Sequence, residues 1–282
     1  MAKVAIVTDS TAYIPGDLVK KYSLTIAPQV LIWGEESFKD GVDIQPAEFY
    51  TRLSKATVMP STSQVTIPDF TKIFGDLKEQ GYDILAVLLA NSLSGTIDSA
   101  IHAKAAHPDA RIELVDSNTT AMALGFLVLT VARAAQDGAS LADCKALAEK
   151  ARQHVGVVFA VDTLEFLHRG GRIGGGSRFL ATALNIKPIL EVTGGRVEGI
   201  EKVRTRKKSL NRLVELVVER CAGRQPVRLA TLHANAEEEA KEILAIATEQ
   251  LKPVESIFAS VSPVIGTHAG PGTVGLAYMA GM

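Results

Sequence analysis

The chain has 282 residues, which is long for one compact hydrophobic core and makes two domains the natural expectation. Hydrophobic residues make up 47% of the chain and charged residues 22%, a composition typical of folded globular proteins and not of disordered ones. The net charge of −1 at pH 7 provides no overall electrostatic attraction to nucleic acid, so we expect no nucleic-acid partner.

The sequence also lacks the signals of membrane insertion and secretion. No apolar run approaches the roughly 18 residues that a transmembrane helix requires. The N-terminus has the pattern of a strand and lacks the apolar core and cleavage site of a signal peptide. Cys144 and Cys221 lie singly in helical patterns, which indicates buried thiols in a reducing compartment. We therefore expect a cytoplasmic protein without a transmembrane segment.

The first half of the chain alternates strands and helices. Apolar runs predict three buried strands, and each is followed by a loop rich in hydroxyl side chains and then by a helix. The predicted strands are 4–7, 84–90 and 111–115, with an extended segment at 24–33, a hairpin-like segment at 35–43, a polar loop at 59–64, and helices at 46–54, 68–80, 97–106, 121–137 and 140–154. This alternation is typical of a parallel α/β sheet.

The second half has a different pattern, with a Gly194-Gly195 pair that predicts a hairpin. The predicted strands there are 155–161, 188–192, 196–203, 227–232 and 254–260, and the predicted helices are 177–184, 207–221 and 236–251. The fold class we predict is α/β with two domains. Residues 1–160 form a parallel-sheet α/β domain, and residues 161–282 form a mixed-sheet α+β domain.

Neutral hydroxyl donors gather in loops that follow predicted strands, where open parallel sheets bind their ligands. They are Ser10, Thr62, Ser63, Ser94 and Thr96. Several precede helices, whose first N–H groups favour an anion. Together they predict a pocket for one small anionic head group. The alternative is that each one caps a helix, which Ser and Thr do routinely.

A glycine-rich basic loop follows the strand predicted at 155–161. Arg169 and Arg172 alternate with glycines over residues 168–176, and an apolar helix comes next. Guanidinium groups present a fixed fork of donors that suits a carboxylate or a phosphate. The loop is therefore a candidate anion site, and the alternative is a flexible surface loop with solvated arginines.

The sequence at residues 270–275 matches G-x-G-x-x-G, between an expected strand and an expected helix. It fails as a dinucleotide-binding fingerprint, because neither a second strand nor an acidic residue about 20 positions later follows. We expect its glycines to form a tight turn that presents His268, whose small neighbours at 266–270 cannot bury it. The six histidines are scattered without a ligand motif, so we expect no metal and no cofactor.

A serine hydrolase is the alternative function. Ser94 lies at a strand-to-helix turn, and Ser94, either Asp116 or Asp162, and His268 follow the chain order of a hydrolase triad. The nucleophile-elbow pattern requires glycines two residues before and two after the serine, where this chain has Ser92 and Thr96.

A basic run marks the start of the helix predicted at 207–221. It consists of Lys202, Arg204, Arg206, Lys207 and Lys208. Positive charge at a helix N-terminus opposes the helix dipole, so local stability does not account for it. The run is either a solvated face or a patch for docking or phosphate binding.

Five segments resemble, in order, the motifs of the bacterial DegV family. They are VAIVTDST at 4–11, Thr62-Ser63-Gln64, Leu93-Ser94-Gly95-Thr96, Gly171-Arg172-Ile173 and GTHAGPG at 266–272. The resemblance implies two α/β domains with a long-chain fatty acid between them. It also implies a lipid-binding subunit without catalysis of its own. In that system a separate ATP-binding fatty acid kinase subunit phosphorylates the bound carboxylate, and the acyl phosphate feeds phospholipid synthesis.

The resemblance also implies roles for single residues. It places the fatty acid carboxylate at Thr62 and Ser94, in a hydrogen-bond network that also contains Ser63, Gly95, Thr96 and His268. It places Arg172 and Gly171 near the head group. It places Arg204 and Arg206 in contact with the kinase subunit. Two segments depart from the family pattern, Tyr13-Ile14 and Val65-Thr66-Ile67. The second departure bears on the preferred acyl chain length.

Overall fold

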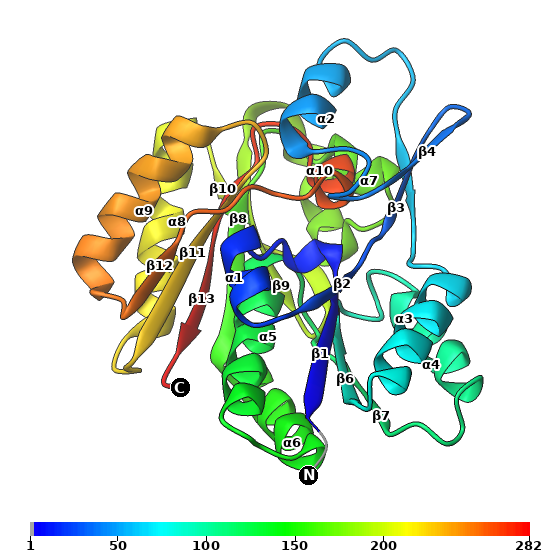
Figure 1. The fold of residues 1–282 in the computed structure, drawn as a ribbon. Helices are drawn as coiled ribbons and strands as arrows, with labels where there is room; N and C mark the ends of the chain where they lie inside the picture. Colours follow the sequence, from blue (N-terminus) through cyan, green and yellow to red (C-terminus); the bar gives the residue numbers. More distant parts are fainter. Residues whose placement is uncertain (1–2) are drawn as a thin grey trace.

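The computed structural model describes residues 3–282, with side chains omitted at 181–185, and Figure 1 shows its arrangement. A four-stranded sheet in the order β2-β1-β6-β7 is parallel throughout. Its strands are β1 (Val4–Asp9), β2 (Thr25–Ala27), β6 (Asp83–Leu88) and β7 (Ile112–Asp116). Every residue of β6 is buried, as expected for a strand with helices on both faces. The predicted parallel α/β sheet is confirmed.

Alternate side chains of this sheet face two different helix layers. Val7, Ile84 and Ala86 pack with α3 (Ile67–Glu79) and α4 (Thr96–Ala105). The other set, which includes Leu85 and Val87, packs with α5 (Ala121–Gln136) and α6 (Leu141–Ala151). The strand period of two residues therefore assigns each apolar side chain to one of two cores.

The second sheet has six strands in the order β10-β9-β8-β13-β11-β12, and only the β11–β12 pair is parallel. Its strands are β8 (Val155–Ala160), β9 (Lys187–Thr193), β10 (Arg196–Val203), β11 (Val227–His233), β12 (Glu255–Ile257) and β13 (Val274–Ala280). Gly194 and Gly195 take positive φ in the turn between β9 and β10, as the predicted hairpin requires. The predicted mixed sheet is confirmed.

β8 precedes the predicted domain boundary between residues 160 and 161, yet it pairs with β9 and β13. By sheet membership, the second half therefore starts at Val155. One face of this sheet is covered by α8 (Arg206–Cys221) and α9 (Glu237–Leu251).

α5 lies between the two sheets, in contact with β1 and β6 on one side and with β8 and β13 on the other. Its first nine residues are all buried, and these nine residues are apolar. A helix of this kind has no face for solvent and belongs in the interior. α5 covers part of one face of the mixed sheet. The remaining apolar side chains of that face can contact other parts of the molecule.

A third sheet, β4-β3-β5, was not predicted as a sheet, whereas α2 (Pro46–Leu53) confirms the helix predicted at 46–54. The extended segment at 24–33 divides at Pro28 into β2 of the parallel sheet and β3 (Val30–Trp33). β3 pairs antiparallel with β4 (Glu36–Lys39) and with β5 (Ser61–Ser63). The prediction of a polar loop at 59–64 is therefore wrong at 61–63, because Thr62 pairs with Leu31 across the ladder.

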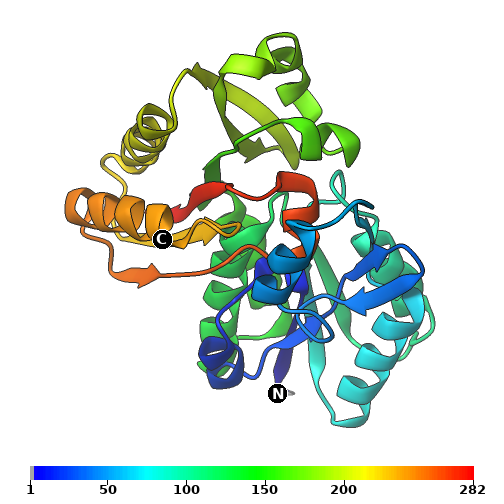
Figure 2. The ribbon, with the colours of Figure 1, turned by 90° about the horizontal axis from the view of Figure 1, so that it is seen from above.

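The remaining elements are short. They are η1 (Ser10–Ala12), α1 (Gly16–Lys21), η2 (Arg152–His154), α7 (Glu165–Arg169), η3 (Gly174–Asn185) and α10 (Pro263–Ala269). Seen from above, α10 lies centrally, next to α2 and the α7 region (Figure 2). The segment 270–275 follows this helix and leads into β13, so the predicted order of strand then helix around it is wrong.

Candidate functional site

A cavity lies where the loops at the carboxyl ends of β1 and β6 meet the inner face of the mixed sheet, next to α10. Its lining combines hydroxyl and amide side chains, one arginine, one histidine and many aliphatic groups. The lining residues are Thr11, Gln29, Thr62, Ser63, Gln64, Leu89, Leu93, Ser94, Gly95, Thr120, Ala121, Val157, Phe159, Leu167, Arg172, Val192, Val197, Leu232, Val261, Val264, Ile265, His268, Ala269 and Thr273.

The apolar wall of this cavity follows from strand periodicity. Val157 and Phe159 of β8 lie on the face of the mixed sheet opposite to α8 and α9, because residues two apart share a face. Val192, Val197 and Leu232 come from three further strands of the same face. These side chains provide a continuous aliphatic surface that excludes water from one side of the cavity.

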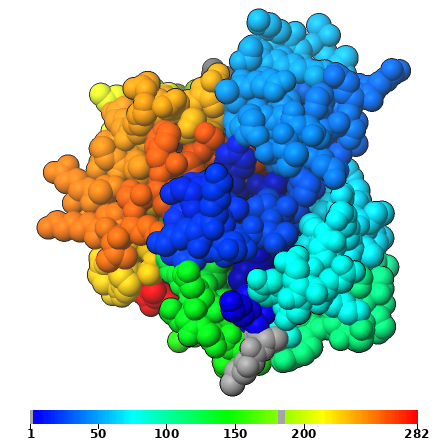
Figure 3. Space-filling model, in the orientation of Figure 1, coloured from blue at the N-terminus to red at the C-terminus, as the bar shows by residue number. Residues whose placement is uncertain are grey.

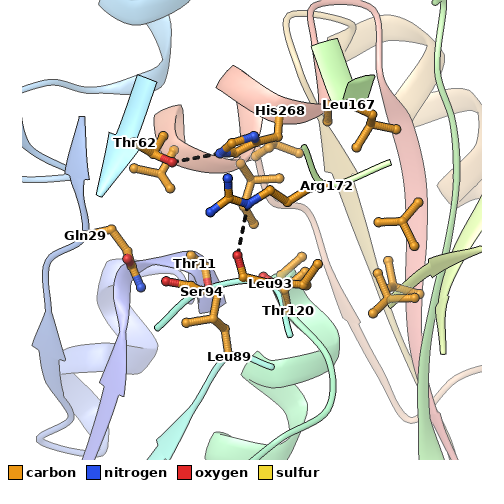
Figure 4. A pocket seen from close by; sticks show the side chains of 18 of the residues that line it. Thr11, Gln29, Thr62, Leu89, Leu93, Ser94, Thr120, Leu167, Arg172 and His268 are labelled. Carbon is orange, nitrogen blue, oxygen red and sulfur yellow. Dashed lines mark hydrogen bonds between the residues drawn. The ribbon is translucent and has the colours of Figure 1, made fainter. Parts of the chain in front are cut away.

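Thr62 and His268 meet at the polar end, although they are 206 residues apart. The distance between Thr62 Oγ1 and His268 Nε2 is 2.7 Å (Figure 4). β5 positions Thr62, and the last turn of α10 positions His268. The imidazole Nδ1 is buried without a hydrogen-bond partner among the described residues, and it lies against Gly170, where a Cβ would be only 2.1 Å away.

His268 is therefore largely buried, and the expectation that its small neighbours leave it open is wrong. The ring is enclosed by distant parts of the chain, since α10 packs against α2, α7 and β5. Burial lowers the pKa of His268 to about 4, with a smaller contribution from the positive charge of Arg172. The imidazole is neutral at physiological pH.

A pH titration will test this assignment. The imidazole resonances of His268, identified by their absence in His268→Asn, are expected to stay constant from pH 8 to pH 5.5. In the unfolded chain the same group has a pKa near 6.5, so between pH 6.5 and pH 4 only the unfolded state gains the proton. Lowering the pH from 7.5 to 5 should therefore destabilise the wild type relative to His268→Asn, by about 2 kcal/mol at most. A midpoint near 6.5 would contradict the buried, neutral ring.

Ser94 belongs to a second hydrogen-bonded group. Its Oγ lies 2.9 Å from Thr96 Oγ1, and Gln29 Nε2 donates to Thr96 Oγ1 at 2.9 Å. Gln29 and Thr96 are both buried. The buried pair therefore fixes the position of the Ser94 hydroxyl, which is only half-buried and lines the cavity.

Arg172 is held by two backbone carbonyl groups. Its Nε donates to Leu93 O at 3.1 Å and its Nη1 donates to Gly170 O at 2.7 Å. Figure 4 shows the guanidinium between the Thr62–His268 pair and the segment of Leu93 and Ser94. These bonds orient a positive charge towards the polar end of the cavity.

The structure brings together most of the residues that the sequence singled out. Thr62, Ser63, Ser94, Gly95, Arg172 and His268 all line the cavity. Thr96 does not; it is buried behind Ser94. Gly171 is exposed at φ 70° next to Arg172, and Ser10 hydrogen-bonds to Asp40 elsewhere.

The sequence reasoning missed Gln29, Gln64 and the carbonyl group of Leu93. Gln29 had no sequence signal, because it stands at the break between two strands that join different sheets. Gln64 directly follows the hydroxyl pair at 62–63 and was named only as part of that loop.

The glycines at 174–176 serve packing. A Cβ at Gly174 would lie 2.3 Å from Val197 O, and one at Gly175 would lie 1.7 Å from the carboxylate of Glu198. Both glycines therefore allow η3 to approach β10 closely. In this loop, only Arg172 reaches the cavity lining.

The hydrolase triad is not assembled. Ser94 bonds to Thr96, whereas His268 bonds to Thr62. Asp116 accepts hydrogen bonds from the backbone of Asn91 and Asn118. Asp162 forms ion pairs with Lys187 and Arg206. With no carboxylate at His268 Nδ1, this geometry lacks the group that orients a catalytic histidine.

Arg206 is the half-buried member of the basic run, and the other four members are exposed. Arg206 forms an ion pair with Glu239 and donates to Gly272 O, so its guanidinium is committed within the chain. Its contact with a partner stays a prediction. Arg204 is exposed just before α8, and no ion pair joins it to the described residues.

Within residues 3–282, no helix is long and apolar enough to cross a bilayer. Over the same residues, no group of three or more His, Cys, Asp or Glu side chains is arranged to hold a metal ion.

Comparison with known proteins gives matches over almost the whole chain. Residues 3–281 match the family described as "uncharacterised protein, DegV family". A DegV domain-containing protein of Clostridium perfringens is 36% identical over 279 residues, which cover 98% of each chain. Protein DegV of Bacillus subtilis is 32% identical over 277 residues, again 98% of each chain.

Solved structures show the same fold. A DegV family protein from Thermus thermophilus, described by its fatty acid binding, superposes with a TM-score of 0.93 at 31% identity over 99% of both chains. DegV of Bacillus subtilis, described as a fatty acid binding protein, has a TM-score of 0.90 at 32% identity, over 99% of this chain and 100% of that one.

Proposed function

The chain belongs to the DegV family, and from this premise we propose that it binds a long-chain fatty acid in the cavity described above. The observation that carries the proposal is the division of that cavity into two ends. Thr62, Ser94, Arg172 and His268 gather at one end, and the aliphatic face of the mixed sheet lines the other. A fatty acid has the same division into a carboxylate and an apolar chain.

Two hydrogen-bond relays aim hydroxyl protons at the carboxylate. In the first, His268 is neutral and we assign its proton to Nε2, which then donates to Thr62 Oγ1 and leaves the Thr62 hydroxyl to donate to the ligand. In the second, Gln29 donates to Thr96, whose own proton can go to Gln29 Oε1 at 3.2 Å or to Ser94; when it goes to Ser94, the Ser94 hydroxyl donates to the ligand. Hydrogen bonds to a charged acceptor are worth more than those between neutral groups. Arg172 adds a fixed positive charge beside them.

We further propose that the chain acts as the lipid-binding subunit of a fatty acid kinase, without catalysis of its own. A separate ATP-binding subunit then phosphorylates the bound carboxylate, and the acyl phosphate feeds phospholipid synthesis. The polar end of the cavity supports this role, since Ser63 and Gln64, which line it, are exposed. A carboxylate held there is within reach of a partner, and Arg172 supplies the cation that a phosphoryl transfer requires nearby.

Mass spectrometry of an organic-solvent extract tests the binding. We expect one fatty acid per chain from protein purified after expression in bacteria, released only on denaturation. An extract without fatty acid, from protein that also fails to take up added oleate, would contradict the proposal. Turnover of p-nitrophenyl esters that disappears in Ser94→Ala would instead support the hydrolase.

A further inference from the structure

A second cavity opens on the face shown in Figure 3, where the surface is hollowed between the dark blue, lighter blue and orange segments. It lies between η1 with the start of α1, the loop after β4, and the segment that follows β12. Its lining residues are Ser10, Tyr13, Ile14, Pro15, Gly16, Ile26, Pro28, Asp40, Gly41, Val42, Gln45, Phe258, Ala259 and Ser260. None of them lines the fatty-acid cavity.

Asp40 is the only carboxyl group in this lining, and its residue is only 1% exposed. Its Oδ2 accepts a hydrogen bond from Ser10 Oγ at 2.6 Å. Its Oδ1 has no hydrogen-bond partner of ordinary geometry among the described residues. The Ser262 hydroxyl and the Val264 N–H lie close enough to favour the charged carboxylate. The groups around Asp40 are therefore neutral donors, and no ion pair joins it to the described residues.

The second cavity also lacks a positive charge. Its lining contains no Lys, Arg or His. Burial raises the pKa of Asp40 to about 7, and the nearby carboxyl group of Asp9 adds to the rise. A buried carboxylate without a cationic partner is costly, and a ligand that brings the missing charge recovers part of that cost.

The walls around this carboxyl group are apolar. Ile14 precedes α1 in the sequence, and Ile26 lies in β2, which follows α1. Phe258 and Val42 stand at the opening, with 40% and 66% of their surfaces exposed. Exposed side chains of this size at the rim of a cavity are suited to contact an apolar ligand body. Tyr13 adds a hydroxyl group near Asp40; burial, with a smaller contribution from the negative charge of Asp40, raises the pKa of this phenol.

We propose that this cavity binds a small primary ammonium compound with a short apolar body. The ammonium group donates to the carboxyl group of Asp40 and to the hydroxyl of Tyr13, which both line the cavity. The apolar body lies against Ile14, Val42 and Phe258. A neutral or anionic ligand of the same shape leaves the buried carboxylate unpaired and binds more weakly.

The two cavities are joined by hydrogen bonds. Ser10 Oγ donates to Asp40 and accepts from the backbone N–H of Gln29 at 3.1 Å. The side chain of Gln29 bonds to Thr96, which bonds to Ser94 in the fatty-acid cavity. The ammonium site does not rest on fatty acid binding, since its own lining supplies the charge and the apolar contacts.

Calorimetric titration of the full-length protein with benzylamine at pH 7 tests the proposal, with benzyl alcohol as the uncharged probe. We expect one benzylammonium per chain and at least tenfold weaker binding of the alcohol. Titrations in two buffers of different ionisation enthalpy should show proton release, because the ammonium drives Asp40 to its charged form. Asp40→Asn should weaken benzylamine binding at least tenfold.

A second variant covers the case in which Asp40→Asn does not fold. Val42→Arg places a guanidinium at the opening and should weaken benzylamine binding at least tenfold with an unchanged melting curve. Its matched control is Val254→Arg, because Val254 is 65% exposed and lies outside the lining. The proposal is overturned if millimolar benzylamine does not bind, if the alcohol binds equally well, or if Val42→Arg binds benzylamine like the wild type.

Discussion

The double variant Ser94→Ala, Thr62→Val is expected to lose its fatty acid during purification while keeping the wild-type fold. Each hydroxyl donates to a charged carboxylate in our proposal, and such a hydrogen bond contributes about 1.5–3 kcal/mol. Ser94→Ala alone should weaken retention roughly tenfold or more, and the two losses should combine. Retention is measured by mass spectrometry of the extract and by competition with a fluorescent fatty acid.

Two nearby serines serve as controls for the loss of a hydroxyl group. Ser61 lies on β5 one residue before Thr62 and is exposed, and Ser92 lies two residues before Ser94 and donates to Gly195 O. Neither of them lines the cavity. Ser61→Ala and Ser92→Ala should therefore retain the ligand. Wild-type retention in the double variant, with an unchanged melting curve, would refute the placement of the carboxylate.

Arg204→Ala is expected to keep a normal content of fatty acid and to lose acyl-phosphate formation with the cognate ATP-binding subunit. Arg204 is exposed before α8 and lies outside the cavity lining, so its loss leaves the ligand contacts intact. Arginine is enriched among the residues that dominate protein interfaces, and truncation of such a residue costs about 2 kcal/mol or more. We expect acyl-phosphate formation to fall at least tenfold at limiting subunit concentration.

Arg111→Ala is the matched control for the loss of one surface arginine. Arg111 is exposed beside the first residue of β7, at the end of the parallel sheet away from the cavity, and pairs with Asp83. Its variant should support normal transfer. Arg172→Ala and His268→Ala should impair transfer more than binding. Full transfer activity in Arg204→Ala would exclude that residue from the interface.

Local sequence patterns were sufficient for the longer helices and for most strands. The mainly apolar segment 121–137 predicted a long helix, and α5 occupies that place between the sheets. The hairpin at Gly194-Gly195 also followed from local chemistry, since both residues take positive φ. These features are decided by contacts within a few residues, which a sequence displays directly.

Features that depend on distant contacts were missed or misread. β5 has three residues, which are too few for a periodic pattern, and it forms a strand because it pairs with β3. His268 has small neighbours in sequence, yet α2, α7 and β5 enclose it. The burial of that ring, and the low pKa that results from it, could not be read from the residues around position 268.

By itself, the sequence determined the parallel α/β sheet, the mixed sheet and the chemical character of the site: neutral hydroxyls, one histidine and one arginine. The hydrogen-bond donors and the charge of a side chain depend on its residue type and not on its position, so the sequence was enough to predict this chemical character. Only the tertiary structure decided that Thr96 stands behind Ser94, that Gln29 orients both, and that Arg206 is paired internally. It also decided that valines from separate strands form one apolar wall, because packing brings together residues that no sequence spacing relates.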